Sequence, residues 1–164
     1  MKRFDGKVVV ITGGGSGMGK ISCTLFAQEG ASVCVVDINE KTAKATADEI
    51  IAAGGKAKAY AIDITNEAAV EALFDDAVAT FGRLDVYFTI AGISPVGTAV
   101  TTSYEDYKKV VALDMDSVFL GSKYCIPHMI KTGGGVILNL VGTYGIRPTP
   151  NKLSYSAAKA GALS

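Results

Sequence analysis

The chain has 164 residues, 49% of them apolar, and its 16 basic side chains balance its 16 acidic ones. This length supports one domain with a real core and is too short for two ordinary domains. The balanced charge lacks the basic signature of a nucleic-acid-binding protein. The apolar run near the N-terminus is too short for a signal peptide or a membrane span. We therefore expect a cytoplasmic protein that binds neither nucleic acid nor a membrane.

Short β-branched runs alternate with longer helix-like segments along the chain. The expected strands are 7–12, 32–37, 57–62, 84–90 and 135–141. The expected helices are 18–29, 40–53, 67–81 and 104–131, with a last helix that starts near residue 151. Nearly continuous apolar strands are typical of a parallel sheet buried on both faces, and this alternation implies right-handed crossovers. The sequence predicts an α/β fold, a Rossmann-type doubly wound parallel sheet with helices on both faces.

The C-terminal end of the chain leaves an edge of the predicted sheet uncovered. Only the start of one helix follows the fifth strand, so nothing covers the apolar segment 136–140. A bare strand edge invites aggregation. We therefore expect residues 1–164 to form a single, incomplete domain, truncated after the fifth strand and the start of the next helix.

The three cysteines and the single histidine point to structural roles. Cys23, Cys34 and Cys125 are widely spaced and lie in apolar or helical stretches. We expect buried free thiols in a reducing compartment, with no disulfide and no metal site. His128 follows Pro127 near the end of the long helix, where we expect a surface or capping group.

A glycine-rich segment at 12–19 follows the first strand and opens the first helix. Glycines there permit a tight turn and a close approach to a pyrophosphate, and the helix N-terminus attracts the anion. Asp37 ends the second strand, where a carboxylate accepts ribose hydroxyls and repels a 2′-phosphate. No Arg or Lys stands at Ser16, Ile38 or Asn39, so NAD is favoured over NADP. The alternative is a turn that only packs strand against helix. The predicted contacts here are Gly13, Ser16, Gly17, Met18, Gly19, Asp37 and Ile38.

Two further strand ends point to the same edge of the sheet. Asp63 and Ile64 follow the third strand, where the carboxylate could accept a bond from an adenine amino group. The alternative for Asp63 is a capping or turn residue. Ala91 and Gly92 follow the fourth strand and allow close backbone approach, or form a simple turn. We include all four among the predicted cofactor contacts.

Tyr155 and Lys159 are spaced i, i+4 and therefore share one face of a helix. A free phenol has a pKa of about 10, too high for a general base at neutral pH. A neighbouring ammonium and an oxidised nicotinamide both favour the phenolate, so we expect the pKa of Tyr155 to be lowered. The alternative is a surface Tyr and Lys on an ordinary helix.

These motifs together resemble the short-chain dehydrogenase/reductase family. The resemblance runs from Lys7 to the last residue. It implies that Tyr155 is the catalytic acid/base, and that Lys159 binds the nicotinamide ribose and lowers the pKa of the phenol. It further implies hydride transfer between a nicotinamide and a carbinol carbon, without a metal, in a homodimer or homotetramer. With the preference for NAD, the first hypothesis is a dehydrogenase or reductase of a small or medium secondary alcohol or ketone.

The chain departs from the family pattern at three places. Thr89 and Ile90 replace an Asn-Asn pair, Asp114 replaces an asparagine that organises a proton-relay water, and Gly142 replaces the catalytic serine. Thr143 is the neighbouring hydroxyl that could substitute. Loss of such a donor typically costs on the order of 10²–10³ in turnover. The alternative function is therefore a catalytically impaired NAD-binding relative that acts as a sensor or structural subunit. A nucleotide-independent interaction module has little support.

Overall fold

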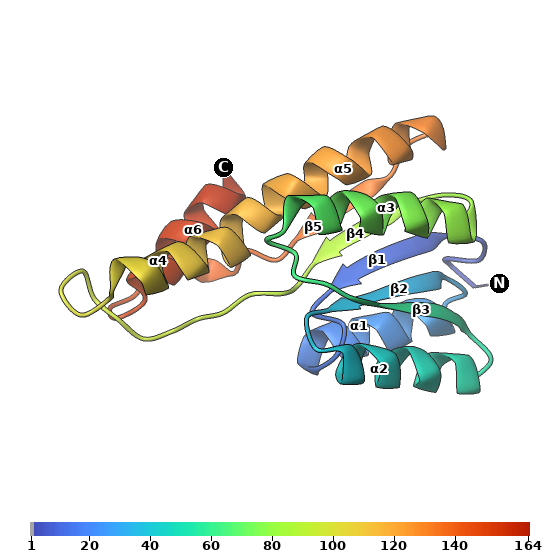
Figure 1. Ribbon diagram of the computed structural model, residues 1–164, viewed down its shortest axis with the longest axis horizontal. Helices are drawn as coiled ribbons and strands as arrows, with labels where there is room; N and C mark the ends of the chain where they lie inside the picture. The colour runs from blue at the N-terminus through green and yellow to red at the C-terminus, as the bar shows by residue number, and fades with distance from the viewer. Residues whose placement is uncertain (1) are drawn as a thin grey trace.

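Five parallel strands form one sheet in the order β3-β2-β1-β4-β5 in the computed structural model, which describes residues 2–164 (Figure 1). The strands are β1 (Val8–Thr12), β2 (Ser32–Asp37), β3 (Lys56–Ala61), β4 (Val86–Thr89) and β5 (Val136–Asn139). The helices are α1 (Gly17–Gln28), α2 (Glu40–Ala52), α3 (Glu67–Phe81), α4 (Tyr104–Val111), the π-helical η1 (Ala112–Asp116), α5 (Ser117–Lys131), the short 3₁₀ turn η2 (Thr143–Gly145) and α6 (Leu153–Leu163). The predicted α/β fold class is confirmed.

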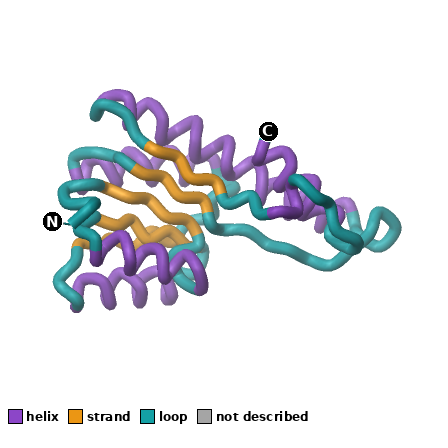
Figure 2. Tube along the Cα trace, turned by 180° about the vertical axis from the view of Figure 1, so that it is seen from behind, coloured by secondary structure: helices purple, strands orange, loops and turns teal. Residues whose placement is uncertain are grey.

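The two faces of the sheet are covered by different helices, as the ribbon and the tube show (Figures 1 and 2). Successive side chains of a strand point to opposite faces. Val8 and Val10 of β1 belong to the core that includes α3 and α5, whereas Val9 and Ile11 belong to the core that includes α1 and α2. Every residue of β1 is therefore buried, which explains why this strand is an unbroken apolar run.

The fourth predicted helix is divided in the structure. A single helix was expected over 104–131, but η1 (Ala112–Asp116) separates α4 from α5. A π-turn of this kind inserts one residue into a helix and is frequent at functional sites. The strand expected at 84–90 is shorter, at Val86–Thr89, and the last helix begins at Leu153 rather than near Asn151. Asn151 has a φ of 63°, which lies outside the helical region.

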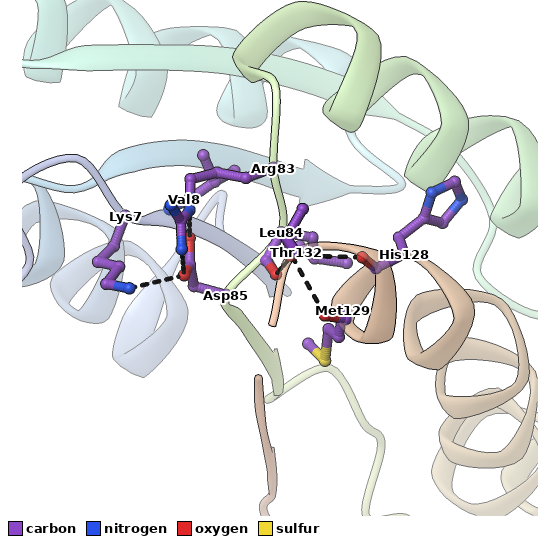
Figure 3. Close-up of polar contacts among 8 residues, drawn as sticks. All are labelled: Lys7, Val8, Arg83, Leu84, Asp85, His128, Met129 and Thr132. Carbon is purple, nitrogen blue, oxygen red and sulfur yellow. Dashed lines mark hydrogen bonds and ion pairs between the residues drawn. The ribbon is translucent and has the colours of Figure 1, made fainter. Parts of the chain in front are cut away.

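The amino ends of three strands meet at one buried residue, Asp85, through its carboxylate and its main chain (Figure 3). Its oxygens accept hydrogen bonds from Lys7 Nζ and the Val8 N–H, each at 3.0 Å. Arg83 adds two more, from Nε at 2.7 Å and Nη2 at 2.6 Å. The Asp85 main chain also bonds to Val8 and to Val136. This cluster ties the starts of β1, β4 and β5 together at the edge opposite the carboxyl ends.

The carboxyl edge of the sheet has the geometry of a ligand crevice. β1 lies between β2 and β4, so the chain leaves β1 toward one side of the sheet and later returns on the other side. Ligands of open α/β sheets bind outside the carboxyl ends of the strands at such a switch point. The helices α4 and α6 lie beyond this edge (Figure 1). No helix within residues 2–164 is long and apolar enough to cross a membrane.

Candidate active site

The glycine loop after β1 is held by main-chain contacts to β2. The Gly14 N–H donates to the Val36 carbonyl at 2.9 Å, and the Gly15 N–H donates to Asp37 Oδ2 at 3.0 Å. A side chain at Gly19 would collide with the Gly13 carbonyl, so the first turn of α1 packs directly on the loop. The loop therefore does pack strand against helix, as the alternative interpretation required, and it also borders a cavity.

A cavity of about 550 Å³ opens beside this loop at the carboxyl edge of the sheet. Eight of the predicted cofactor contacts line it: Gly13, Ser16, Asp37, Ile38, Asp63, Ile64, Ala91 and Gly92. Sequence reasoning missed further lining residues, among them Ile93, Lys109 and Leu113, because they come from a loop and helices without a motif. Gly17, Met18 and Gly19 lie outside the lining.

The residues around this cavity fit a dinucleotide. Gly17 has a φ of 49° and open space where a side chain would stand, so its main chain is accessible to a ligand. Ser16 precedes α1 but makes no side-chain cap, which leaves N–H groups at this helix terminus available for an anion. Asp37 ends β2 on the same cavity with its carboxylate half-exposed.

The two aspartates of the cavity have different hydrogen-bond partners. Asp37 accepts bonds from the N–H groups of Gly15 and Asn39, each at 3.0 Å, which fixes its carboxylate at the mouth of the loop. Asp63 accepts bonds from the Thr65 N–H at 2.9 Å and the Thr65 hydroxyl at 2.7 Å. Asp63 therefore forms the turn that the alternative interpretation described, while it also lines the cavity.

Thr12 has a role that sequence reasoning missed. Its side chain is buried at the end of β1, and its Oγ1 accepts hydrogen bonds from the N–H groups of Ile90 at 3.0 Å and Ala91 at 3.2 Å. These bonds position the segment after β4 next to the glycine loop. A threonine that ends a fully apolar strand was the available signal, because a buried hydroxyl needs a partner.

Tyr155 and Lys159 lie on the same face of α6. The Lys159 Nζ is 5.5 Å from the centroid of the Tyr155 ring. Lys159 is buried, and its Nζ lies 3.1 Å from Oδ1 of Asp114, which is fully buried on η1. The contact is an ion pair, and Oδ1 has no hydrogen-bond partner within residues 2–164. Asp114 Oδ2 accepts a bond from the Ile93 N–H at 3.0 Å.

The electrostatics of this group differ from the prediction. Burial raises the pKa of Tyr155 above its ordinary value, and the negative charge of Asp114 and the nearby Tyr144 act in the same direction. The sequence predicted a lowered pKa from two positive charges, the lysine and an oxidised nicotinamide, and did not weigh burial against them. Burial also raises the pKa of Asp114, while the Ile93 N–H and the Lys159 ammonium oppose that effect. The Lys159 ammonium, which was expected to favour the phenolate of Tyr155, is therefore paired with the carboxylate of Asp114.

The three departures from the family pattern have distinct structural outcomes. Gly142 has φ 68° and ψ 176°, a main-chain conformation essentially limited to glycine, so a serine cannot replace it without strain. Thr143 begins η2 and is exposed. The Thr89 hydroxyl lies 3.1 Å from Asn139 Oδ1 and therefore links β4 to β5.

The other residues considered in the sequence are structural. Cys23, Cys34 and Cys125 are buried free thiols, as predicted. His128 Nε2 lies 3.1 Å from Asp75 Oδ1 and joins α5 to α3. Tyr124 donates to Glu67 at 2.8 Å. Tyr104 and Tyr107 stack on one another at 6.4 Å between ring centroids.

A doubly wound sheet with a cavity at its switch point, together with a Tyr–Lys pair on one helix face, is typical of oxidoreductases. The model of the short chain dehydrogenase family matches residues 7–164. The chain therefore belongs to this family.

Several relatives and solved structures resemble the chain closely. An uncharacterized oxidoreductase of Thermotoga maritima is 42% identical over 160 residues, which are 98% of this chain and 63% of the relative. The cyclohexanol dehydrogenase of an Acinetobacter species is 39% identical, over 97% of this chain and 64% of the relative. The structure of 7α-hydroxysteroid dehydrogenase with NADH and 7-oxo glycochenodeoxycholic acid superposes with a TM-score of 0.93 at 38% identity, over 98% of this chain and 62% of that one. The chain thus spans less than two thirds of the length of these relatives.

Proposed function

We propose that this chain forms the cofactor-binding and proton-transfer part of an NAD-dependent dehydrogenase that interconverts a secondary alcohol and a ketone. Tyr155 is the acid/base and Lys159 its partner. The similarity to a cyclohexanol dehydrogenase and to a steroid dehydrogenase supports a cyclic secondary alcohol as the substrate class. The carboxylate of Asp37 at the cavity supports NAD over NADP.

The observation that carries the proposal is the position of Gly92. This residue lines the cavity together with Gly13 and Asp37. A side-chain carbon built on Gly92 would collide with Asp114 Oδ1 and would lie 3.6 Å from Lys159 Nζ. Tyr155 and Lys159 do not line the cavity. The position of Gly92 supports the proposal because this cavity residue lies beside the Asp114–Lys159 pair.

Each group at this site would have a separate role in the reaction. A bound nicotinamide would supply or accept the hydride. The Tyr155 hydroxyl would donate a proton to the substrate oxygen in ketone reduction and remove it in alcohol oxidation. The main-chain N–H groups at the start of α1 would hold the pyrophosphate. Asp37 would accept hydrogen bonds from the ribose hydroxyls.

The replacement Tyr155→Phe tests this proposal. It removes the hydroxyl and keeps the ring that packs edge-on against Tyr144. We expect turnover of cyclohexanol with NAD to fall by about 10²-fold or more, because general acid/base catalysis typically contributes that much. NAD should still raise the unfolding temperature of the variant, because the cavity is unchanged. Turnover is followed by nicotinamide absorbance.

Tyr144→Phe is the matched control, because it removes the neighbouring hydroxyl and should leave turnover largely intact. Equal rates in the wild type and Tyr155→Phe would overturn the assignment of Tyr155. Stabilisation by NAD without any turnover of secondary alcohols or ketones would instead favour the sensor or structural role.

We further propose a cytoplasmic homodimer or homotetramer. Three buried free thiols suit a reducing compartment. On α5, the side chains of Phe119 and Ile130 are exposed apolar groups on the outer face of the molecule, which suits a contact between subunits.

A further inference from the structure

A buried ion pair lies next to the ring of Tyr155. Asp114 and Lys159 are both nearly inaccessible to solvent, and their charged atoms lie 3.1 Å apart. The π-turn η1 carries Asp114, and the Ile93 N–H holds its second carboxylate oxygen. A buried carboxylate and a buried ammonium at this distance each offset the cost of desolvating the other. Removing one partner would therefore change the field at any third group close by.

Tyr155 is that third group. The Lys159 ammonium lies 5.5 Å from its ring centroid, and a lone positive charge there would favour the phenolate. The carboxylate of Asp114 opposes this effect, and its charge raises the pKa of the phenol in addition to burial. The pair is neutral overall, so the electrostatic potential at Tyr155 is less positive than it would be beside an unpaired ammonium.

Other charged groups on the neighbouring elements either pair with partners of their own or are exposed to solvent. On α4, Lys109 pairs with Glu105 at 2.9 Å. On α5, Lys123 pairs with Glu67 and His128 with Asp75. Asp116 on η1 is exposed. On η2, Tyr144 lies edge-on to Tyr155 at 5.7 Å between ring centroids. Among the described groups, Asp114 is the carboxylate whose charge acts on the phenol, and Lys159 lies 5.5 Å from the centroid of its ring.

We propose that Asp114 is a positioning residue that holds Lys159 in a buried ion pair and thereby keeps Tyr155 protonated over a wider pH range than a neutral residue at this position would. The proposal rests on the assignment of Tyr155 as the acid/base. The proposal predicts a change in the pH dependence of both directions of the reaction. Ketone reduction, which needs the protonated hydroxyl, should persist to higher pH, and alcohol oxidation, which needs the phenolate, should rise only in more alkaline solution.

The charge is removed by Asp114→Asn, which keeps the shape of the side chain and an oxygen for the Ile93 N–H. The first measurement is the tyrosinate absorbance of the cofactor-free protein as a function of pH, with Tyr155→Phe as the reference that isolates the Tyr155 transition. We expect the Tyr155 midpoint to fall by about one pH unit in Asp114→Asn, a typical effect of one nearby charge. Asp116→Asn is the matched control, because it removes an exposed carboxylate from the same turn and should leave the midpoint unchanged.

The second measurement is the pH profile of alcohol oxidation with NAD. Its alkaline rise should move to lower pH in Asp114→Asn by the same amount as the absorbance midpoint. A purely structural role of Asp114 would lower the rate at every pH without moving the profile. If Asp114→Asn does not fold, Asp114→Ser removes the same charge with a smaller side chain.

Three outcomes separate the two proposals. An unchanged Tyr155 midpoint in Asp114→Asn overturns the role of Asp114 while the dehydrogenase assignment stands. Equal shifts in Asp114→Asn and Asp116→Asn also overturn it, because a general change of net charge would then explain the result. A shifted midpoint in a protein without NAD-dependent turnover supports the electrostatic effect of Asp114 and contradicts the proposed function.

Discussion

The proposed preference for NAD over NADP rests on Asp37. Its carboxylate accepts the N–H groups of Gly15 and Asn39 and faces the cavity. Asp37→Asn removes the negative charge that would repel a 2′-phosphate. We expect the ratio of kcat/KM for NAD to that for NADP to fall about tenfold, which corresponds to about 1.4 kcal/mol. The measurement compares initial rates with the two cofactors under identical conditions.

Glu40→Gln is the matched control for Asp37. Glu40 lies in the first turn of α2 but does not line the cavity. A comparable change of the ratio in both variants would show that the general field of this region, and not the position of Asp37, selects the cofactor.

At the scale of whole elements, the Asp85 cluster fastens β1, β4 and β5 at their amino ends. Burial alone would raise the pKa of Asp85, but Arg83, the Val8 N–H and Lys7 more than offset this, so its pKa is lowered. A lowered pKa in the folded state stabilises the protein above the ordinary pKa of the carboxyl, and this contribution is lost as the pH falls through the folded value. We expect Asp85→Asn to lower the free energy of unfolding at pH 7 by about 2 kcal/mol.

Urea denaturation at several pH values measures this contribution. The difference between the wild type and Asp85→Asn should be largest near neutral pH and should shrink in acid. Asp48→Asn breaks the exposed pair with Lys44 on α2 and should change stability little. A difference for Asp85→Asn that stayed constant into acid would show that packing, rather than the carboxylate charge, explains the loss.

Elements with a local signal were predictable, and those that depend on distant partners were not. The glycine loop and the Tyr155–Lys159 spacing each lie within one short segment, so the sequence alone located them. The π-turn at Ala112–Asp116 inserts a single residue, which apolar periodicity over a long helix does not resolve. The ion pair of Asp114 with Lys159 joins two helices far apart in sequence. The lowered pKa predicted for Tyr155 was argued from Lys159 and an oxidised nicotinamide, whereas burial and the charge of Asp114 raise it.

At the scale of the whole molecule, the burial of the strands decreases from the centre of the sheet to its β5 edge. β1 is paired on both sides, with β2 and with β4, and all five of its residues are buried. β5 is paired with β4 alone, and the side chains of Val136 and Leu138 are 53% and 40% exposed. Strands with few buried apolar contacts open locally at a lower free energy than the core.

Native-state hydrogen exchange of this 164-residue chain should therefore distinguish the two strands. We expect the amides of β1 to exchange only through global unfolding, with rates that rise steeply with denaturant, because every neighbour of β1 must separate first. The amides of β5 should exchange faster through local opening that depends weakly on denaturant. Equal protection of β5 and β1 would contradict this gradient. It would show that a further segment or a second copy covers the β5 edge in solution, since an isolated edge strand has nothing else to keep it closed.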